Sequence, residues 1–266
     1  MQGSLVTSKS AHRGVFGFSG SFTPQRLVVS ILALCALALV APRRAAAQQT
    51  IFNVPSATVT DKGKLFVQNE GQFRPYPPGE FYAGTQYQAV GIGANTELDL
   101  TMLNITAPST HNLSMGVGAK SCIPIFKKRF PARDYKITVG ELLPIQLQGD
   151  QSCGSWTYAH VSGRLPKLRS RVTAGVSAGT RQIFGRDVVC FIGGFEHDLT
   201  KNMDLQLDWF SGRHSLGLFI PGFSYAFPRD YTLYAGFQIP NYKENGRTGF
   251  VIELAKILPL SKKASP

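Results

Sequence analysis

The segment at residues 188–210 constrains the fold more than any other, because its side chains alternate with a period of two. From Met203 to Trp209, apolar and polar residues follow one another without a break, so the two kinds lie on opposite faces of an extended strand. A short polar connection at residues 197–202 joins this run to an earlier extended run, as in a turn between antiparallel strands. The segment therefore predicts a β-hairpin, and a fold built as an array of such hairpins.

The same alternation recurs along most of the chain. We expect about twelve strands of roughly ten residues each, the length with which a tilted strand crosses a bilayer. The pattern predicts an all-β protein, an antiparallel up-and-down β-barrel. The predicted strands are residues 65–73, 81–91, 97–105, 113–120, 135–143, 156–165, 171–180, 188–196, 203–210, 216–225, 231–239 and 249–257.

The start of the chain has the pattern of a secretory signal peptide. Residues 27–40 are apolar and uncharged, Lys9, Arg13 and Arg26 precede them, and three alanines at residues 45–47 follow. This run is shorter than the roughly 20 apolar residues of a transmembrane helix. We therefore predict a signal peptide at residues 1–47, an N-terminal linker at 48–62, a barrel at 63–258 and a polar C-terminal tail at 259–266.

The residues opposite the aliphatic positions indicate whether the polar face of each strand lines the lumen or the exterior of the barrel. They are mainly Gly, Ser, Thr and Gln, which suit a crowded, hydrated lumen, and aromatic residues gather toward the strand ends, as at the two interfaces of a membrane barrel. We therefore predict a transmembrane β-barrel, the form in which strands span lipid with their backbone satisfied. Most connections at one end are short, at residues 93–96, 166–170, 197–202 and 227–230, which predicts a periplasmic N-terminus.

Three stretches resemble a known family. They are residues 91–100 (GIGANTELDL), 210–217 (FSGRHSLG) and 234–241 (YAGFQIPN). They are similar to bacterial outer-membrane β-barrel proteins, especially the channel-like family named after the meta-pathway of phenol degradation. The resemblance implies a Gram-negative outer membrane, insertion by the barrel-assembly machinery, and passive transport of small solutes.

The polar strand faces supply candidates for the wall of such a channel, where charged side chains would set selectivity. Two alternatives stay open: a sealed structural or adhesive barrel, and a lipid-modifying barrel enzyme that uses His160 with Ser162 or His214 with Ser215. We expect no enzyme, because no nucleophile motif accompanies these histidines. The predicted lumen-lining residues are Gln68, Glu70, Gln86, Gln88, Glu97, Asp99, Lys120, Lys136, Arg171, Glu196, Asp204, Asp208 and Glu253.

The chain is basic, with a formal net charge of +12. The basic residues are scattered, so nucleic acid is not expected as a partner, whereas outer-membrane lipids and lipopolysaccharide are acidic neighbours that fit. The residue spacing suggests no metal or cofactor. Cys122, Cys153 and Cys190 follow the predicted signal peptide, and the expected topology allows one disulfide, between Cys153 and Cys190.

Overall fold

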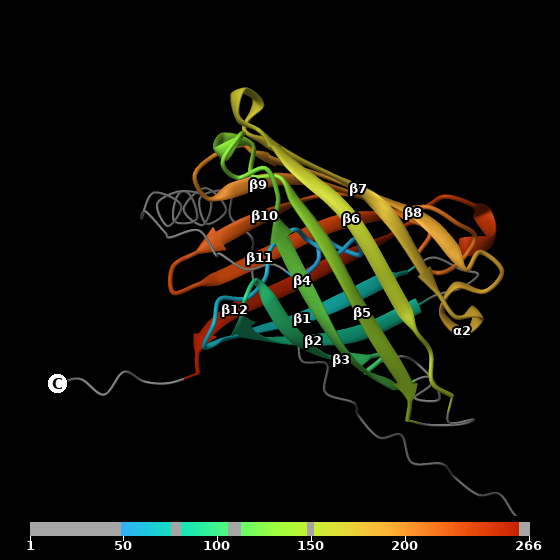
Figure 1. Cartoon of the computed structure of the whole chain (residues 1–266). Coiled ribbons are helices and arrows are strands. Elements are labelled where there is room, and N and C mark those ends of the chain that lie inside the picture. Colours follow the sequence, from blue (N-terminus) through green and yellow to red (C-terminus); the bar gives the residue numbers. More distant parts are fainter. Residues whose placement is uncertain (1–48, 76–80, 106–112, 148–151, 261–266) are drawn as a thin grey trace, which may run out of the picture. The chain divides into compact units, whose positions relative to one another are not determined.

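The computed structural model describes residues 49–75, 81–105, 113–147 and 152–260 of the chain, which fall within one compact unit, Ala41–Pro266. Strands make up most of this part of the chain (Figure 1). They are β1 (Lys64–Arg74), β2 (Phe81–Gly93), β3 (Thr96–Leu103), β4 (Ser114–Pro124), β5 (Lys136–Gln146), β6 (Trp156–Leu165), β7 (Ser170–Gly179), β8 (Val189–Asp198), β9 (Met203–Phe210), β10 (Leu218–Phe227), β11 (Tyr231–Pro240) and β12 (Gly249–Pro259).

These strands form a closed barrel. Each strand pairs antiparallel with its neighbours in sequence, and β1 also pairs with β12, from Lys64 opposite Pro259 to Phe73 opposite Phe250. Closure leaves no strand with a free edge. The predicted fold, an all-β antiparallel up-and-down barrel of about twelve strands, is confirmed. The ladder is interrupted where β10 meets β11, between Phe219 and Gly222, because Pro221 has no N–H to donate.

The two ends of the barrel differ in their connections. Tight turns at residues 94–95, 166–169, 199–202 and 228–230 lie at the end where β1 begins, which we call the turn end. The opposite end, where β1 finishes, is the loop end. Short helices decorate both: η2 (Pro131–Arg133) and η3 (Pro166–Leu168) at the turn end, and α2 (Arg181–Phe184) and η4 (Lys243–Asn245) at the loop end.

Side chains alternate between the lumen and the exterior along each strand. On β12, Val251, Glu253 and Ala255 are buried, whereas Ile252 and Leu254 are exposed. The exposed faces of the other strands are likewise rich in aliphatic and aromatic residues. The barrel thus has an apolar exterior and a lumen with many polar side chains. No helix in the described part of the chain is long and apolar enough to cross a membrane.

Candidate functional site

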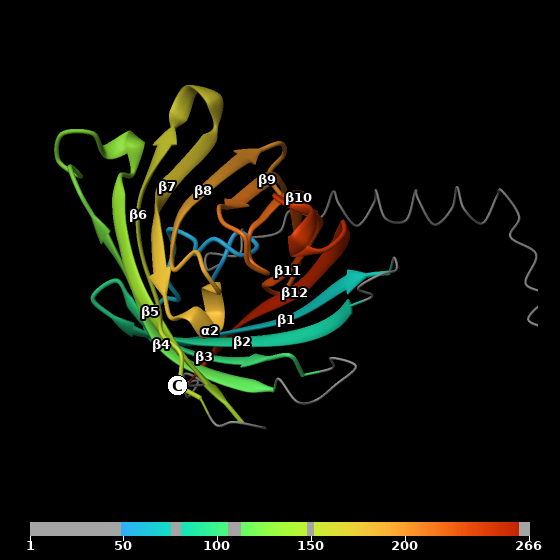
Figure 2. The ribbon, with the colours of Figure 1, turned by 90° about the vertical axis from the view of Figure 1, so that its right-hand side faces the viewer.

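The lumen of the barrel contains the chain's own residues 49–60, which we call the luminal segment. Every residue from 49 to 57 is buried, and Figure 2 shows the segment (blue) surrounded by strands. It folds back on itself: Ile51 N–H donates to the Val54 carbonyl at 2.8 Å, and Ser56 N–H to the Gln49 carbonyl at 3.0 Å. The stretch expected to be a linker is therefore a packed element inside the barrel.

Asp208 on β9 holds the tip of the luminal segment. Its Oδ2 accepts the backbone N–H groups of Phe52, Asn53 and Val54 at 3.0, 2.8 and 2.7 Å. Successive N–H groups that converge on one oxygen form a concave anion-binding nest. Hydrogen bonds to a charged group contribute about 1.5–3 kcal/mol each, so this carboxylate is a strong anchor.

Glycines in the barrel wall make room for the tip. A Cβ at Gly194 would lie 2.2 Å from the Ile51 side chain, and a Cβ at Gly222 or Gly236 would lie 2.5 or 2.9 Å from the Phe52 ring. Each distance is shorter than a real contact between carbon atoms. The inner surfaces of β8, β10 and β11 are thus shaped to hold these two apolar side chains.

An ion pair anchors the luminal segment on the other side of the lumen. Lys120 on β4 lies 2.8 Å from Glu97 on β3, with both side chains buried. Lys120 also donates to the Gln49 carbonyl at 2.9 Å, and Glu97 accepts the Thr60 N–H at 2.6 Å. Lys120 and Glu97 thus make additional hydrogen bonds to the backbone of the segment, as a buried ion pair requires.

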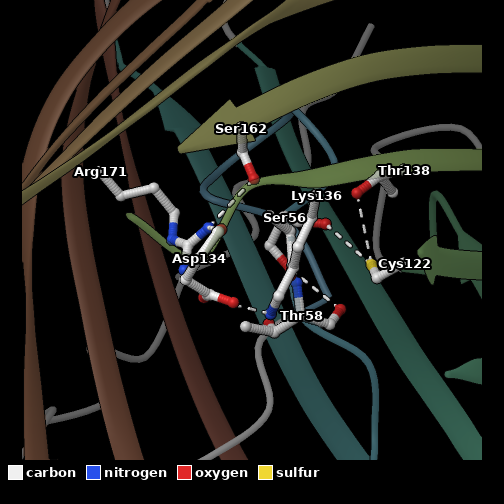
Figure 3. A network of polar contacts seen from close by, with 9 residues as sticks. Ser56, Thr58, Cys122, Asp134, Lys136, Thr138, Ser162 and Arg171 are labelled. Atoms are coloured by element: carbon white, nitrogen blue, oxygen red, sulfur yellow. Dashed lines mark hydrogen bonds and ion pairs between the residues drawn. The ribbon is translucent and has the colours of Figure 1, made fainter. Parts of the chain in front are cut away.

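A polar network near the turn end makes further contacts with the luminal segment (Figure 3). Lys136 on β5 donates to the Ala57 carbonyl at 3.1 Å and lies 3.6 Å from Asp134. Asp134 also pairs with Arg171 on β7, which donates to Ser162 at 3.0 Å. Lys136 thus holds the segment directly, and Arg171 supports Lys136 through Asp134.

The predicted lumen residues lie where strand alternation puts them, with two exceptions. The interior set comprises Gln68, Glu70, Glu97, Asp99, Lys120, Arg171, Asp208 and Glu253, all buried, and Lys136, Glu196 and Asp204, which are partly buried on inward faces. The prediction for Gln86 and Gln88 is wrong. On β2 the buried residues are Ala83, Thr85, Ala89 and Gly91, all at odd-numbered positions, so both glutamines lie on the outer face.

The three cysteines in the described part of the chain, Cys122, Cys153 and Cys190, are free thiols, so the structure does not contain the predicted Cys153–Cys190 disulfide. Cys153 is exposed in the connection between β5 and β6. Cys190 points into the barrel, where its Sγ lies 3.1 Å from His214 Nε2. The two thiols therefore face different surroundings.

The histidine pairs considered for catalysis do not form hydrogen-bonded dyads. His214 contacts Cys190, whereas Ser215 is exposed. Burial lowers the pKa of His214 below its ordinary value, so the imidazole is neutral at pH 7. Ser162 accepts a hydrogen bond from Arg171, and the buried His160 ring lies at the backbone of Pro55 in the luminal segment.

A cavity of about 370 Å³ opens at the loop end. It lies between the ends of β4 and β5 and the helix α2, and the described residues that line it carry no charge. Its polar lining consists of hydroxyl and amide side chains, from Asn104, Ser114, Gln146, Ser152, Gln182 and Ser215.

Comparisons with known proteins find similar structures only. No family model and no curated protein matches the chain, so the resemblance to the meta-pathway family stays a prediction. The KdgM porin in complex with disordered oligogalacturonate is 9% identical, with a TM-score of 0.46 over 73% of this chain and 98% of that one. The NanC porin is 10% identical, with a TM-score of 0.45 over 72% of this chain and 98% of that one. Outer membrane phospholipase A from Escherichia coli is 11% identical, with a TM-score of 0.44 over 76% of this chain and 91% of that one. These likenesses are weak, and the fold assignment rests on the strand pairing itself.

Proposed function

We propose that this protein is an outer-membrane channel for small polar solutes that its luminal segment closes. The observation that carries the proposal is the combination of a closed barrel, an apolar exterior and a lumen that has many polar side chains and is occupied by residues 49–60. A membrane channel needs the apolar exterior and the polar side chains in its lumen. A regulated channel also needs an element that can leave the lumen.

The exterior supports a membrane location. Exposed apolar side chains encircle the barrel, including Val172 and Val176 on β7, Phe237 on β11 and Ile252 on β12. An apolar surface that continues around a whole molecule is unfavourable in water but matches the hydrocarbon of a bilayer. Because the ladder is closed, its backbone groups need no hydrogen bonds from the lipid.

The lumen supports passage of polar solutes. Three acidic side chains, Glu70, Glu253 and Asp208, lie on β1, β12 and β9, and two more, Glu97 and Asp99 on β3, lie beside Lys120. Basic side chains, such as Lys120 and Arg171, come from β4, β5 and β7. Charges of both signs around a passage create a field in it and select among solutes. The uncharged cavity at the loop end would admit neutral, hydroxylated molecules as well.

A sealed structural barrel is the second candidate, and the close packing of the luminal segment favours it. Asp208, Lys120 and Lys136 all hold backbone atoms of the segment. The two candidates differ in what happens when these contacts are weakened. A gated channel then conducts, whereas a sealed barrel loses stability and stays closed.

Liposome swelling with refolded protein separates the candidates. Asp208→Asn keeps the shape of the side chain but removes the charge that holds three N–H groups, so we expect several-fold faster swelling with sugars than for the wild type. Deletion of residues 49–56 should raise the rate further. Glu196→Gln is the matched control, since it removes a luminal carboxylate whose charged neighbours all lie outside residues 49–60, and should leave the rate unchanged. If the deletion variant folds, as judged by heat-modifiable gel mobility, and stays impermeable, the channel proposal is wrong.

A further inference from the structure

Two carboxylates face each other across the seam where the first and last strands meet. Glu70 on β1 lies directly opposite Glu253 on β12, and both residues belong to the lumen, with 4% and 0% of their surface exposed. Directly opposed residues have Cβ atoms about 4.5–5.5 Å apart. Two acidic groups are thus held near each other and away from bulk water.

The neighbours of this pair supply hydrogen bonds but no positive charge. Glu70 accepts from Gln72 at 2.6 Å and from the Tyr87 hydroxyl at 3.2 Å, and Glu253 Oε2 accepts from Gln68 Nε2 at 2.7 Å. Neither carboxylate belongs to an ion pair among the described residues. Two buried, ionised carboxylates without a counter-charge are strongly unfavourable, so the pair takes up either a proton or a cation.

Two oxygens in the site lack partners. Glu253 Oε1 and Gln68 Oε1 have no hydrogen-bond partner in the structure, and Gln68 is 0% exposed. A proton shared between the carboxylates would satisfy Glu253 Oε1. It would leave the Gln68 carbonyl oxygen, which can only accept, without a partner. A cation would satisfy both oxygens at once.

We propose that Glu70, Glu253 and the Gln68 carbonyl oxygen bind a hard divalent cation of the calcium class. Carboxylate and amide oxygens are the ligands that such ions prefer, and water completes their coordination shell. A charge of +2 balances the two carboxylates. Since its ligands come from β1 and β12, the ion would tie the first strand to the last. The proposal depends on the barrel and not on solute conduction.

Terbium luminescence tests this site in the folded protein, because Tb³⁺ binds oxygen ligands of the calcium kind and emits when a nearby tyrosine is excited. Tyr87 touches Glu70 and can act as the sensitiser. We expect tyrosine-excited emission from the wild type that added Ca²⁺ abolishes. Glu253→Gln should remove the emission, and Glu196→Gln, a luminal carboxylate on β8, should retain it.

A second variant keeps the test valid if Glu253→Gln does not fold. Gln68→Leu leaves both carboxylates but removes the neutral ligand, and should weaken Tb³⁺ binding at least roughly tenfold, the smallest loss typical for partners of a metal site. Folded wild type without tyrosine-sensitised emission would overturn the proposal and leave a shared proton as the account of the pair. An equal loss of Tb³⁺ emission in Glu253→Gln and Glu196→Gln would also overturn the proposal, because it would indicate that Tb³⁺ adsorbs generally to the lumen.

Discussion

Four glutamines on β1 and β2 occupy two environments. Gln68 and Gln72 belong to the lumen side and donate to Glu253 and Glu70 at 2.7 and 2.6 Å. Gln86 and Gln88 lie on the outer face, where Gln86 donates to Asn69 and Gln88 donates to Gln86, each at 3.4 Å. In a bilayer, this outer face contacts hydrocarbon, and a polar group with poor hydrogen bonds is costly there.

Substitution of one glutamine from each environment should therefore have opposite effects. Gln86→Leu removes a poorly satisfied amide from the outer face and should raise the free energy of unfolding by about 1–2 kcal/mol. Gln72→Leu deletes a luminal donor to Glu70 and should lower it. Urea unfolding in lipid vesicles measures both values. A loss of stability in Gln86→Leu would contradict the placement of this side chain in lipid.

The luminal segment is the element that links fold to proposed function. The barrel holds its backbone through Asp208 at the tip and through Lys120 and Glu97 on the opposite side, and it packs the Ile51 and Phe52 side chains against wall glycines. The proposed gating requires this segment to leave as a unit when its anchors weaken.

Displacement of the luminal segment can be followed at a natural reporter, Cys122. Its Sγ lies 4.0 Å from the Ser56 carbonyl, and the residue is 3% exposed. A methyl group at Gly194 would clash with Ile51, so Gly194→Ala should loosen the segment and speed alkylation of Cys122 several-fold. Peptide mass spectrometry distinguishes this thiol from the other two.

Two variants control this measurement. Gly193→Ala places a methyl group on the outer face, where the nearest side-chain atom is 3.8 Å away, and should leave the alkylation rate unchanged. Ile51→Ala combined with Gly194→Ala relieves the clash and should restore slow alkylation. Equal rates in Gly194→Ala and the wild type would contradict the packing of Ile51 against β8.

This element also marks the limit of prediction from the sequence. Ile51, Phe52 and Val54 are apolar residues in a stretch otherwise typical of a linker, and they are the one signal of a packed segment. Its partners could not be inferred, because Asp208 is 154 positions from Val54 and no local pattern connects them. The inward face of β2 was misjudged for a related reason: residues 81–91 have polar side chains on both faces, so alternation alone does not select one.

At the scale of the whole molecule, the period of two was sufficient to predict the barrel. Strand length, antiparallel order and the number of strands follow from alternation and from the turn residues between runs, which are local properties. The closing pair of β1 and β12 follows from the strand count, because an open sheet would leave two long edges unpaired. The contents of the lumen do not follow, since they depend on contacts between distant segments.

The orientation of the whole barrel is the remaining prediction. The short turns predict that the turn end faces the periplasm and the loop end faces outward. Cys153 is exposed in a loop-end connection, whereas Cys122 and Cys190 are 3% and 2% exposed inside the barrel. A membrane-impermeant maleimide added to intact cells should therefore label Cys153 alone, as read by peptide mass spectrometry, and Cys153→Ser should abolish the label. If Cys153 is labelled only after the outer membrane is disrupted, the barrel has the opposite orientation. With the predicted orientation, the luminal segment enters from the periplasmic side, so a signal that opens the channel would act there.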